Sequence, residues 1–219
     1  MDQRILEISR RIFLDVGANT GQTLAAVLDR RFRFDEIVCF EPSLICWEKL
    51  EQVEAKVKAE SGAEPKPQPQ PIIRIERFGL WNKTCQQAIF EPGRKGASLW
   101  KKEKATRDNT EMCEFVRATD WFKENIKDGD TVFLKLNCEG AECDILDDLL
   151  ESGEFSKVAY AMIDFDVRKI ATQKHREAEL RHKLANLIFP RVAFAKAVMI
   201  GATHEARIKN WLHVIGADQ

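Results

Sequence analysis

The residues best suited to chemistry stand where apolar runs end. Asp15 lies near the end of the apolar run 11–16, and Gly17 and Gly21 follow it closely. The residues after Gly21 have a helical pattern of apolar positions as far as residue 32. Strand, tight turn and helix, in that order, place a cofactor at the carboxyl end of the strand in a parallel α/β sheet. Asp15, Gly17, Ala18, Asn19 and Gly21 are therefore candidate cofactor-binding residues.

A second apolar run, 37–40, ends at Glu41 and Pro42. Glu41 follows Gly21 by about 20 residues, which is where an acid at the end of a second strand binds ribose hydroxyls. An alternative interpretation is that Asp15 and Glu41 only solvate strand ends. The register of strand, turn, helix, strand and acid favours a binding site.

The glycine spacing distinguishes between cofactors. In the dinucleotide pattern G-x-G-x-x-G, the middle glycine leaves room for a pyrophosphate, and Asn19 stands at that place here. A side chain there favours a ligand with one ribose and no phosphate, such as S-adenosylmethionine. The spacing therefore favours a methyltransferase over a dehydrogenase.

Three later strands end in further candidates. The run 131–138 passes directly into Glu139 and a helix, which makes Lys135, Asn137 and Glu139 candidate site residues, or else Lys135 and Glu139 form an ion pair. An alternating strand at 72–78 leads to Gly79 and Leu80, which we expect beside an adenine ring. A strand at 157–165 places Asp164 and Asp166 on one side, where they either position a substrate or are simply solvated.

The composition sets limits on the function. The chain has 219 residues and a hydrophobic content of 44%, which suits a single domain over 1–219. A net charge of −1 disfavours nucleic acid as a partner, and no apolar run is long enough to cross a membrane. Six cysteines without C-x-x-C spacing indicate buried reduced thiols in a cytoplasmic protein with no metal site.

Two segments are expected to be surface loops, a proline-rich one at 61–71 and a basic one at 92–110 that either meets an anionic substrate or is solvated. The pattern further predicts helices at 43–60, 120–126 and 171–189. Apolar runs at 194–201 and 208–215 predict a terminal hairpin.

Three stretches resemble the FkbM family of S-adenosylmethionine-dependent methyltransferases. They are Asp15–Gly21, Phe40-Glu41-Pro42 and the stretch Leu134–Glu142, which contains Lys-x-x-x-Glu-Gly-Ala-Glu. The loop Gly96-Ala97-Ser98 and the stretch Ala118-Thr119-Asp120 also resemble that family, and the similarity covers about residues 10–166.

The resemblance implies a doubly wound, Rossmann-like α/β domain with helices on both faces and a seven-stranded sheet whose last strand is antiparallel. It implies that Gly17, Ala18, Asn19 and Gly21 surround the methionine end of the cofactor and that Glu41 holds the ribose. It also implies O-methylation of a sugar or another small molecule. The family usually has Asp at the place of Asn137, and asparagine cannot act as a base.

The expected reaction is an in-line methyl transfer in which the protein aligns the nucleophile, the methyl group and the sulfur atom. A hydroxyl nucleophile would gain from a general base, for which Glu139, Asp164 and His204 are the candidates in that order. A nucleotide-dependent oxidoreductase and a catalytically inactive cofactor-binding scaffold stay open as alternatives. The acceptor and the oligomeric state are not encoded in any motif.

Overall fold

The computed structural model describes residues 9–60, 69–94, 96–100, 109–187 and 189–219. Most of the expected proline-rich loop (61–68 of 61–71) and much of the expected basic loop (95 and 101–108 of 92–110) lie outside the described residues.

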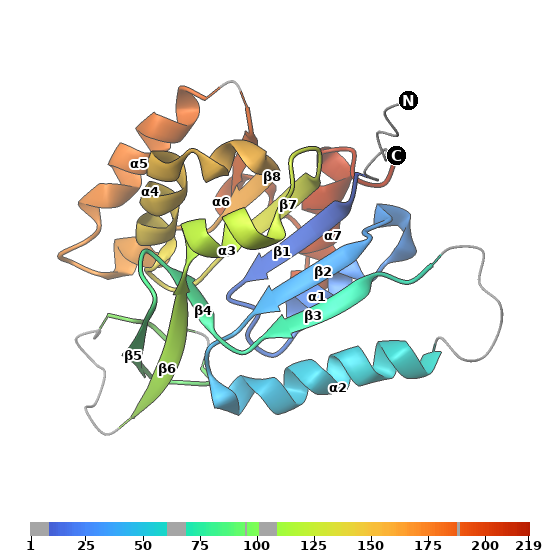
Figure 1. Ribbon diagram of the computed structural model, residues 1–219, viewed down its shortest axis with the longest axis horizontal. Coiled ribbons are helices and arrows are strands. Elements are labelled where there is room, and N and C mark those ends of the chain that lie inside the picture. Colours follow the sequence, from blue (N-terminus) through green and yellow to red (C-terminus); the bar gives the residue numbers. More distant parts are fainter. Residues whose placement is uncertain (1–8, 61–68, 95, 101–108, 188) are drawn as a thin grey trace, which may run out of the picture.

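A six-stranded sheet forms the centre of the molecule, in the order β3-β2-β1-β7-β8-β9 (Figure 1). Its strands are β1 Arg11–Val16, β2 Glu36–Phe40, β3 Ile72–Glu76, β7 Thr131–Leu136, β8 Val158–Ile163 and β9 Arg191–Phe194. Every pairing in this sheet is parallel. The strand order reverses direction between β1 and β7, which makes the carboxyl ends of these two strands the switch point where ligands bind in open α/β sheets.

Alternating side chains of each strand build two apolar layers, one on each face of the sheet. Ile12, Leu14 and Val16 of β1 belong to a core cluster with α3, α4 and α5, whereas Phe13 belongs to a cluster with α1, α2, α6 and α7. The helices are α1 Gln22–Val27, α2 Leu44–Glu60, α3 Ala118–Asn125, α4 Glu142–Ser152, α5 His175–Ala185, α6 Ala195–Val198 and α7 His204–Val214. In Figure 1, α3, α4 and α5 lie above the sheet and α2 lies below it. The doubly wound α/β class predicted from the sequence is confirmed.

A second sheet of three strands stands beside the carboxyl ends of the first (Figure 1). It consists of β4 Gly79–Trp81, β5 Cys85–Phe90 and β6 Thr110–Arg117, in the order β4-β6-β5. Its inward side carries Cys113 and Phe115. Glu111 of β6 accepts hydrogen bonds from Ser43 Oγ and Leu44 N, both at 2.7 Å, so this carboxylate caps α2 and ties the small sheet to the main one.

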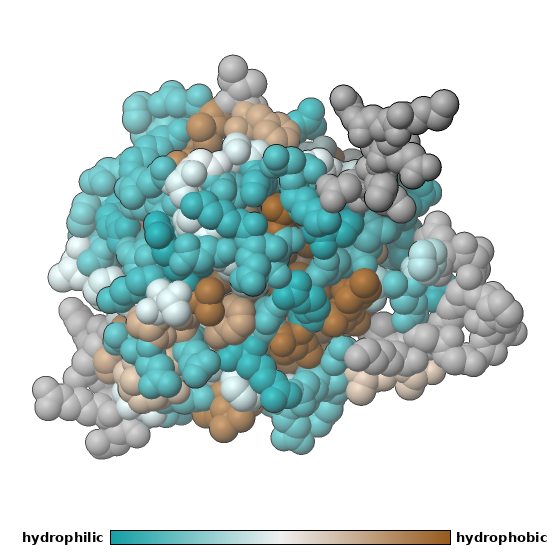
Figure 2. Space-filling model, in the orientation of Figure 1, coloured by the Kyte–Doolittle hydropathy of each residue, from teal (hydrophilic) through white to brown (hydrophobic). Residues whose placement is uncertain are grey.

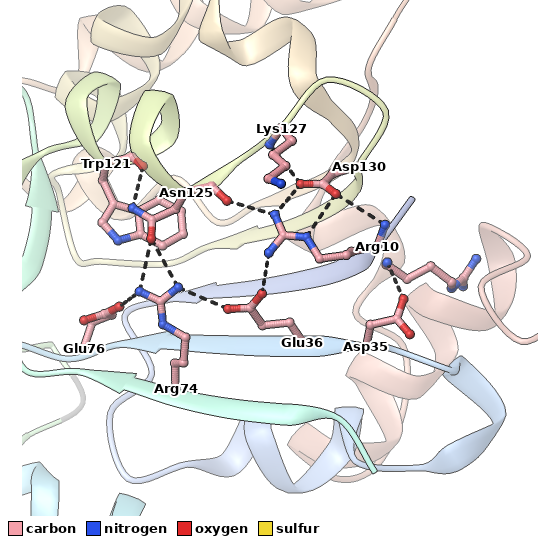
Figure 3. Close-up of polar contacts among 10 residues, drawn as sticks. Arg10, Asp35, Glu36, Arg74, Glu76, Trp121, Asn125, Lys127 and Asp130 are labelled. Carbon is pink, nitrogen blue, oxygen red and sulfur yellow. Dashed lines mark hydrogen bonds and ion pairs between the residues drawn. The ribbon is translucent and has the colours of Figure 1, made fainter. Parts of the chain in front are cut away.

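Two arginines connect the elements at the opposite end of the sheet (Figure 3). Arg10 binds Asp130 at 2.6 Å and Glu36 at 2.9 Å, and Arg74 binds the other oxygen of Glu36 at 3.1 Å. Arg74 also donates to the side-chain oxygen of Asn125 in α3. Since the Asp130 and Glu36 carboxylates are nearly buried, these hydrogen bonds compensate for their removal from water.

The carboxyl-terminal part differs from the prediction. The hairpin expected from 194–201 and 208–215 is wrong, because β9 is followed by the short α6 and then by α7. Residues 208, 211, 212 and 215 repeat with the helical period, and Ile208, Trp211 and Leu212 are buried against β1 and α1. The antiparallel last strand is likewise wrong for the described residues, since β9 pairs with β8 in parallel. The main sheet therefore has six described strands instead of the expected seven.

The surface is mostly hydrophilic on the face shown in Figure 2, where brown areas are scattered among teal ones. Leu44, Ile45 and Ile72 are among the large apolar side chains that are more than half exposed. No helix within the described ranges is both long and apolar enough to cross a membrane.

Candidate functional site

A pocket of about 380 Å³ lies at the carboxyl ends of β1, β2, β7 and β8, between the main sheet and the small sheet. We call it the strand-end pocket. Its walls come from the turn after β1, the end of β2, the start of β4, the turn after β7, the turn after β8 and the first residue of α7. The switch point of the sheet therefore contains a pocket that is lined by these and further segments of the chain.

The backbone N–H groups of the turn after β1 are all hydrogen-bonded within the protein. Gly17 N and Ala18 N donate to Phe40 O at 3.1 and 3.0 Å, and Gly21 N donates to Ala18 O at 3.0 Å. Asn19 N donates to Glu41 Oε2 at 2.8 Å, and Thr20 N donates to the side-chain oxygen of Asn19 at 2.9 Å. The turn therefore directs no unused N–H of residues 17–21 into the pocket. A pyrophosphate, which dinucleotide folds bind through such N–H groups, would find no unused donor among residues 17–21.

Glycine is required at both ends of this turn, for different reasons. Gly17 has φ +82°, and a β-carbon on it would lie 2.0 Å from Asn137 O, so β1 and β7 end in direct backbone contact. Gly21 has φ +83°, and its β-carbon would meet Leu50 Cδ1 of α2 at 3.0 Å. Gly17 lines the pocket, whereas Gly21 packs against α2 outside it.

Glu41 closes β2 and faces the same pocket. It is 7% exposed and accepts hydrogen bonds from Asn19 N and, at 2.9 Å, from Ser43 N. Burial raises the pKa of Glu41 to about 7, although the two N–H groups favour the charged form. A carboxylate has about four acceptor positions, so two backbone donors leave room for ligand hydroxyls.

One end of the strand-end pocket is apolar. Its lining includes Phe40, Pro42, Leu80, Ile89 and Phe115. Gly79 allows the Phe115 ring to approach, since a β-carbon at this position would lie 2.5 Å from Phe115 Cε1. Aromatic and aliphatic walls beside the Glu41 carboxylate suit a planar heterocycle attached to a ribose.

The turn after β7 contributes polar groups to the pocket. Asn137 N donates to Val16 O at 3.1 Å, which holds this turn against β1. The side-chain Oδ1 of Asn137 is buried and has no hydrogen-bond partner within the described part of the chain. A buried acceptor of this kind is costly unless a donor meets it, so it marks a place for a ligand N–H or O–H.

The buried carboxylate of Glu142 holds the turn after β7 through hydrogen bonds to its backbone. Glu142 in the first turn of α4 accepts hydrogen bonds from Cys138 N at 3.0 Å and Gly140 N at 2.9 Å. Its side chain is fully buried, and burial raises the pKa of Glu142 to about 8. Gly140 has φ +112°, and Ile170 and Trp100 pack where its β-carbon would be. Glu142 therefore shapes the turn without lining the pocket.

Charged side chains after β8 complete the polar rim. Lys169 binds Asp166 at 2.9 Å and Glu139 at 3.2 Å. Arg168 binds Asp166 at 3.2 Å and Asp164 at 3.3 Å. The three carboxylates and two cations thus form one chain of ion pairs that connects the turn after β7 with the turn after β8.

His204 reaches the pocket from the start of α7, and its Nε2 lies 3.0 Å from Thr23 Oγ1 of α1. The sequence predicted a hairpin connection here, so His204 is placed by a helix that the sequence interpretation missed. Thr203 caps α7 by accepting a hydrogen bond from Ala206 N, which fixes where the histidine begins the helix.

Most of the predicted site residues meet in this one pocket. Those that line it are Gly17, Ala18, Asn19, Glu41, Pro42, Gly79, Leu80, Asn137, Glu139, Asp164 and His204. Asp15 and Gly21 do not line it. The alternative pairing of Lys135 with Glu139 is wrong, because Lys135 Nζ lies 2.8 Å from Asp15 Oδ1 and Glu139 pairs with Lys169.

Several lining residues were missed by the sequence interpretation. Ile89 and Phe115 come from the small sheet, and Arg168 and Lys169 come from the turn after β8. The basic pair two residues after Asp166 was a readable signal for the turn, whereas nothing local indicates that β5 and β6 fold over the pocket. Gly93, Arg94, Gly96 and Ala97 of the expected basic loop also line it.

The chemistry of the described side chains limits what the site can hold. No group of three or more His, Cys, Asp or Glu side chains within the described ranges is arranged to hold a metal ion. The described thiols carry no disulfide, and burial raises the pKa of Cys46 and Cys143 to about 12. These two thiols are therefore poor nucleophiles.

Comparisons with known proteins give one distant match. No protein-family model matches the chain, and no curated protein sequence matches it. The crystal structure of a methyltransferase, FkbM from Methylobacillus flagellatus KT, is similar at 17% sequence identity and a TM-score of 0.45. The match covers 81% of this chain and 39% of that one, so the chain spans well under half the length of that protein. A likeness this distant identifies neither a substrate nor a site residue.

Proposed function

We propose that the strand-end pocket binds S-adenosylmethionine and that the protein is a methyltransferase acting on a hydroxyl group of a small molecule or carbohydrate. One observation carries the proposal. The N–H groups of the turn after β1 are hydrogen-bonded within the protein, while the Glu41 carboxylate lines the pocket at the end of β2. This arrangement suits a ligand that has one ribose and no phosphate.

The residues present fit the two halves of that cofactor. Glu41 would accept hydrogen bonds from the ribose hydroxyls, and the apolar end with Leu80 and Phe115 would enclose the adenine ring. Asn137 Oδ1, which has no hydrogen-bond partner among the described residues, would accept a hydrogen bond from the amino-acid end of the cofactor. The cofactor would supply a methyl group on a positively charged sulfur, which is its own leaving group.

The protein's part in the reaction is then alignment and proton removal. The acceptor would lie on the polar side, beside the ion pairs of Asp164, Asp166 and Glu139. Glu139 and Asp164, ranked first and second as bases from the sequence, each offer an oxygen to a cation, whereas His204 contacts the neutral hydroxyl of Thr23. We therefore place His204 ahead of both carboxylates as the base for a hydroxyl acceptor.

A nucleotide-dependent oxidoreductase is the second candidate. The all-parallel strand order β3-β2-β1-β7-β8-β9 favours it, because dinucleotide-binding folds have the same order. The absence of free N–H groups in residues 17–21 stands against it. A scaffold that binds the cofactor without catalysis is a third candidate, since Asn137 cannot act as a base.

Calorimetric titration separates these candidates. The purified protein is titrated with S-adenosylhomocysteine and, separately, with NAD, and Glu41→Ala is compared with the exposed α2 variant Glu48→Ala as a matched control. Binding of S-adenosylhomocysteine alone, weakened about tenfold or more in Glu41→Ala only, supports the proposal. Binding of NAD alone overturns it. Transfer of labelled methyl groups to a cell extract then distinguishes an enzyme from a scaffold.

A further inference from the structure

An ion pair lies buried beneath the strand-end pocket. Asp15 of β1 and Lys135 of β7 are register partners in the parallel ladder, and Lys135 Nζ lies 2.8 Å from Asp15 Oδ1. The two side chains are 0% and 3% exposed. Lys135 lines the pocket, whereas Asp15 lies outside its lining.

The ammonium group of Lys135 also holds the turn after β1. Nζ donates to Gly17 O at 2.8 Å and, more weakly, to Val16 O at 3.5 Å. The same peptide group that contains Gly17 O also contains Ala18 N, which donates to Phe40 O at 3.0 Å. This peptide is therefore held at both ends, by β7 on one side and β2 on the other.

Lys135 is decisive for this peptide because Gly17 has no β-carbon to restrict it. The peptide before it is held independently, since Val16 O accepts from Asn137 N and Gly17 N donates to Phe40 O. Among the described residues, the only hydrogen bond recorded to Gly17 O comes from Lys135. Without that bond, the peptide between Gly17 and Ala18 keeps only the hydrogen bond from Ala18 N to Phe40 O, so it is held at one end instead of two.

Stability alone does not explain the pair. Removing two charges from water is costly, and well-packed apolar side chains of similar size often replace a buried ion pair without loss of stability. The second oxygen of Asp15, Oδ2, is buried without a hydrogen-bond partner in the described part of the chain. An imperfectly compensated pair at this point suggests a role in fixing one local conformation.

We propose that Lys135, oriented by Asp15, is a positioning residue that fixes the peptide between Gly17 and Ala18, so that the strand-end pocket accepts the amino-acid end of the S-adenosyl cofactor. This rests on the proposed function. Gly17 and Ala18 line the pocket, and Gly17 meets the backbone of Asn137, whereas Leu80 and Phe115 belong to the apolar end. Loss of the bond to Gly17 O therefore affects the amino-acid end of the ligand and leaves the nucleoside end in place.

The test compares two ligands that differ only at that end. S-adenosylhomocysteine carries the amino acid, and 5′-methylthioadenosine keeps the nucleoside and the thioether without it. The protein and the double variant Asp15→Leu/Lys135→Met are titrated with each, and thermal unfolding is recorded for both. We expect an unchanged melting temperature, unchanged affinity for 5′-methylthioadenosine and at least tenfold weaker binding of S-adenosylhomocysteine.

The other outcomes are distinguishable. If both ligands weaken equally, or if neither weakens in a folded double variant, the positioning role is overturned. If the unsubstituted protein binds neither ligand, the proposed function fails instead. Should the double variant not fold, Lys135→Met alone is compared with Leu180→Ala, a core truncation in α5. A selective loss for S-adenosylhomocysteine in Lys135→Met supports the role, and an equal loss in both variants overturns it.

Discussion

Gly17 and Asn137 approach each other so closely that a β-carbon on Gly17 would lie 2.0 Å from the carbonyl oxygen of Asn137. The contact joins the ends of β1 and β7 at the switch point of the sheet. The two backbone segments cannot move apart without breaking hydrogen bonds, because Asn137 N donates to Val16 O and Gly17 N donates to Phe40 O. The absence of a β-carbon at Gly17 therefore allows the ends of β1 and β7 to lie in contact beside the strand-end pocket.

Gly17→Ala should destabilise the fold and abolish binding of S-adenosylhomocysteine. The substitution adds a backbone clash to the strain of φ +82°, and the two effects together should cost about 3 kcal/mol or more of unfolding free energy. Gly129→Ala is the matched control, because Gly129 has φ +94° and nothing within 4 Å of its β-carbon position. Urea denaturation should show a loss of only about 1 kcal/mol for Gly129→Ala. Equal losses in the two variants would contradict the clash.

Glu41 should make ligand binding depend on pH. Its pKa is raised to about 7 by burial, so the carboxylate that accepts ribose hydroxyls is a minor form at pH 6 and the major form at pH 8. Affinity for S-adenosylhomocysteine should rise by roughly tenfold over this interval, in proportion to the charged fraction. Titration calorimetry at both pH values measures it. Glu41→Gln should bind more weakly with a flat profile, and a profile as steep as that of the unsubstituted protein would rule out Glu41 as its source.

Glu142 should lower the stability of the protein at alkaline pH. Its pKa rises from 4.5 to about 8 on folding, so its contribution is fully present below pH 4.5 and is lost as the pH rises through about 8. The full change corresponds to about 5 kcal/mol, at about 1.4 kcal/mol for each pH unit. Urea denaturation of the protein and of Glu142→Gln at pH 4.5, 6 and 8 isolates it as the difference between the two curves. A constant difference across this range would disprove the assignment, and the exposed variant Glu114→Gln serves as control.

Arg10→Met should be strongly destabilising, because it leaves the Asp130 carboxylate, which is 3% exposed, without its main partner. Burial opposes ionisation of Asp130, but the hydrogen bonds and charge of Arg10, together with the hydrogen bond from Lys127 N, outweigh it and hold the pKa of this carboxyl below its ordinary value. Since Arg10 itself is 31% exposed, we expect a loss of about 2 kcal/mol, below the range for a fully buried pair. The loss should shrink in strong acid, where Asp130 is protonated in both proteins. Arg31→Met, which breaks the exposed pair with Asp29, should leave the urea midpoint unchanged.

The sequence by itself determined the features that are encoded within short segments. The runs before Gly17, Glu41 and Asn137 are strands followed directly by turns, and parallel strands bring their carboxyl ends to one edge. Their alternating apolar residues also predict that both faces of the sheet are covered. This is why the doubly wound class and most of the lining of one pocket could be predicted without coordinates.

Only the tertiary structure decided which distant groups meet. Lys135 has acidic neighbours in sequence, yet it pairs with Asp15 because register in the parallel ladder places the two side chains on one face. Glu111 caps α2 across 67 residues, which no local pattern records. The run 208–215 is short and apolar enough to suit either a strand or a helix, and packing of Trp211 against β1 and α1 selects the helix that carries His204 to the pocket. Short-range patterns specify elements, whereas charge pairing and closure of the pocket depend on contacts that form only when the whole sheet is assembled.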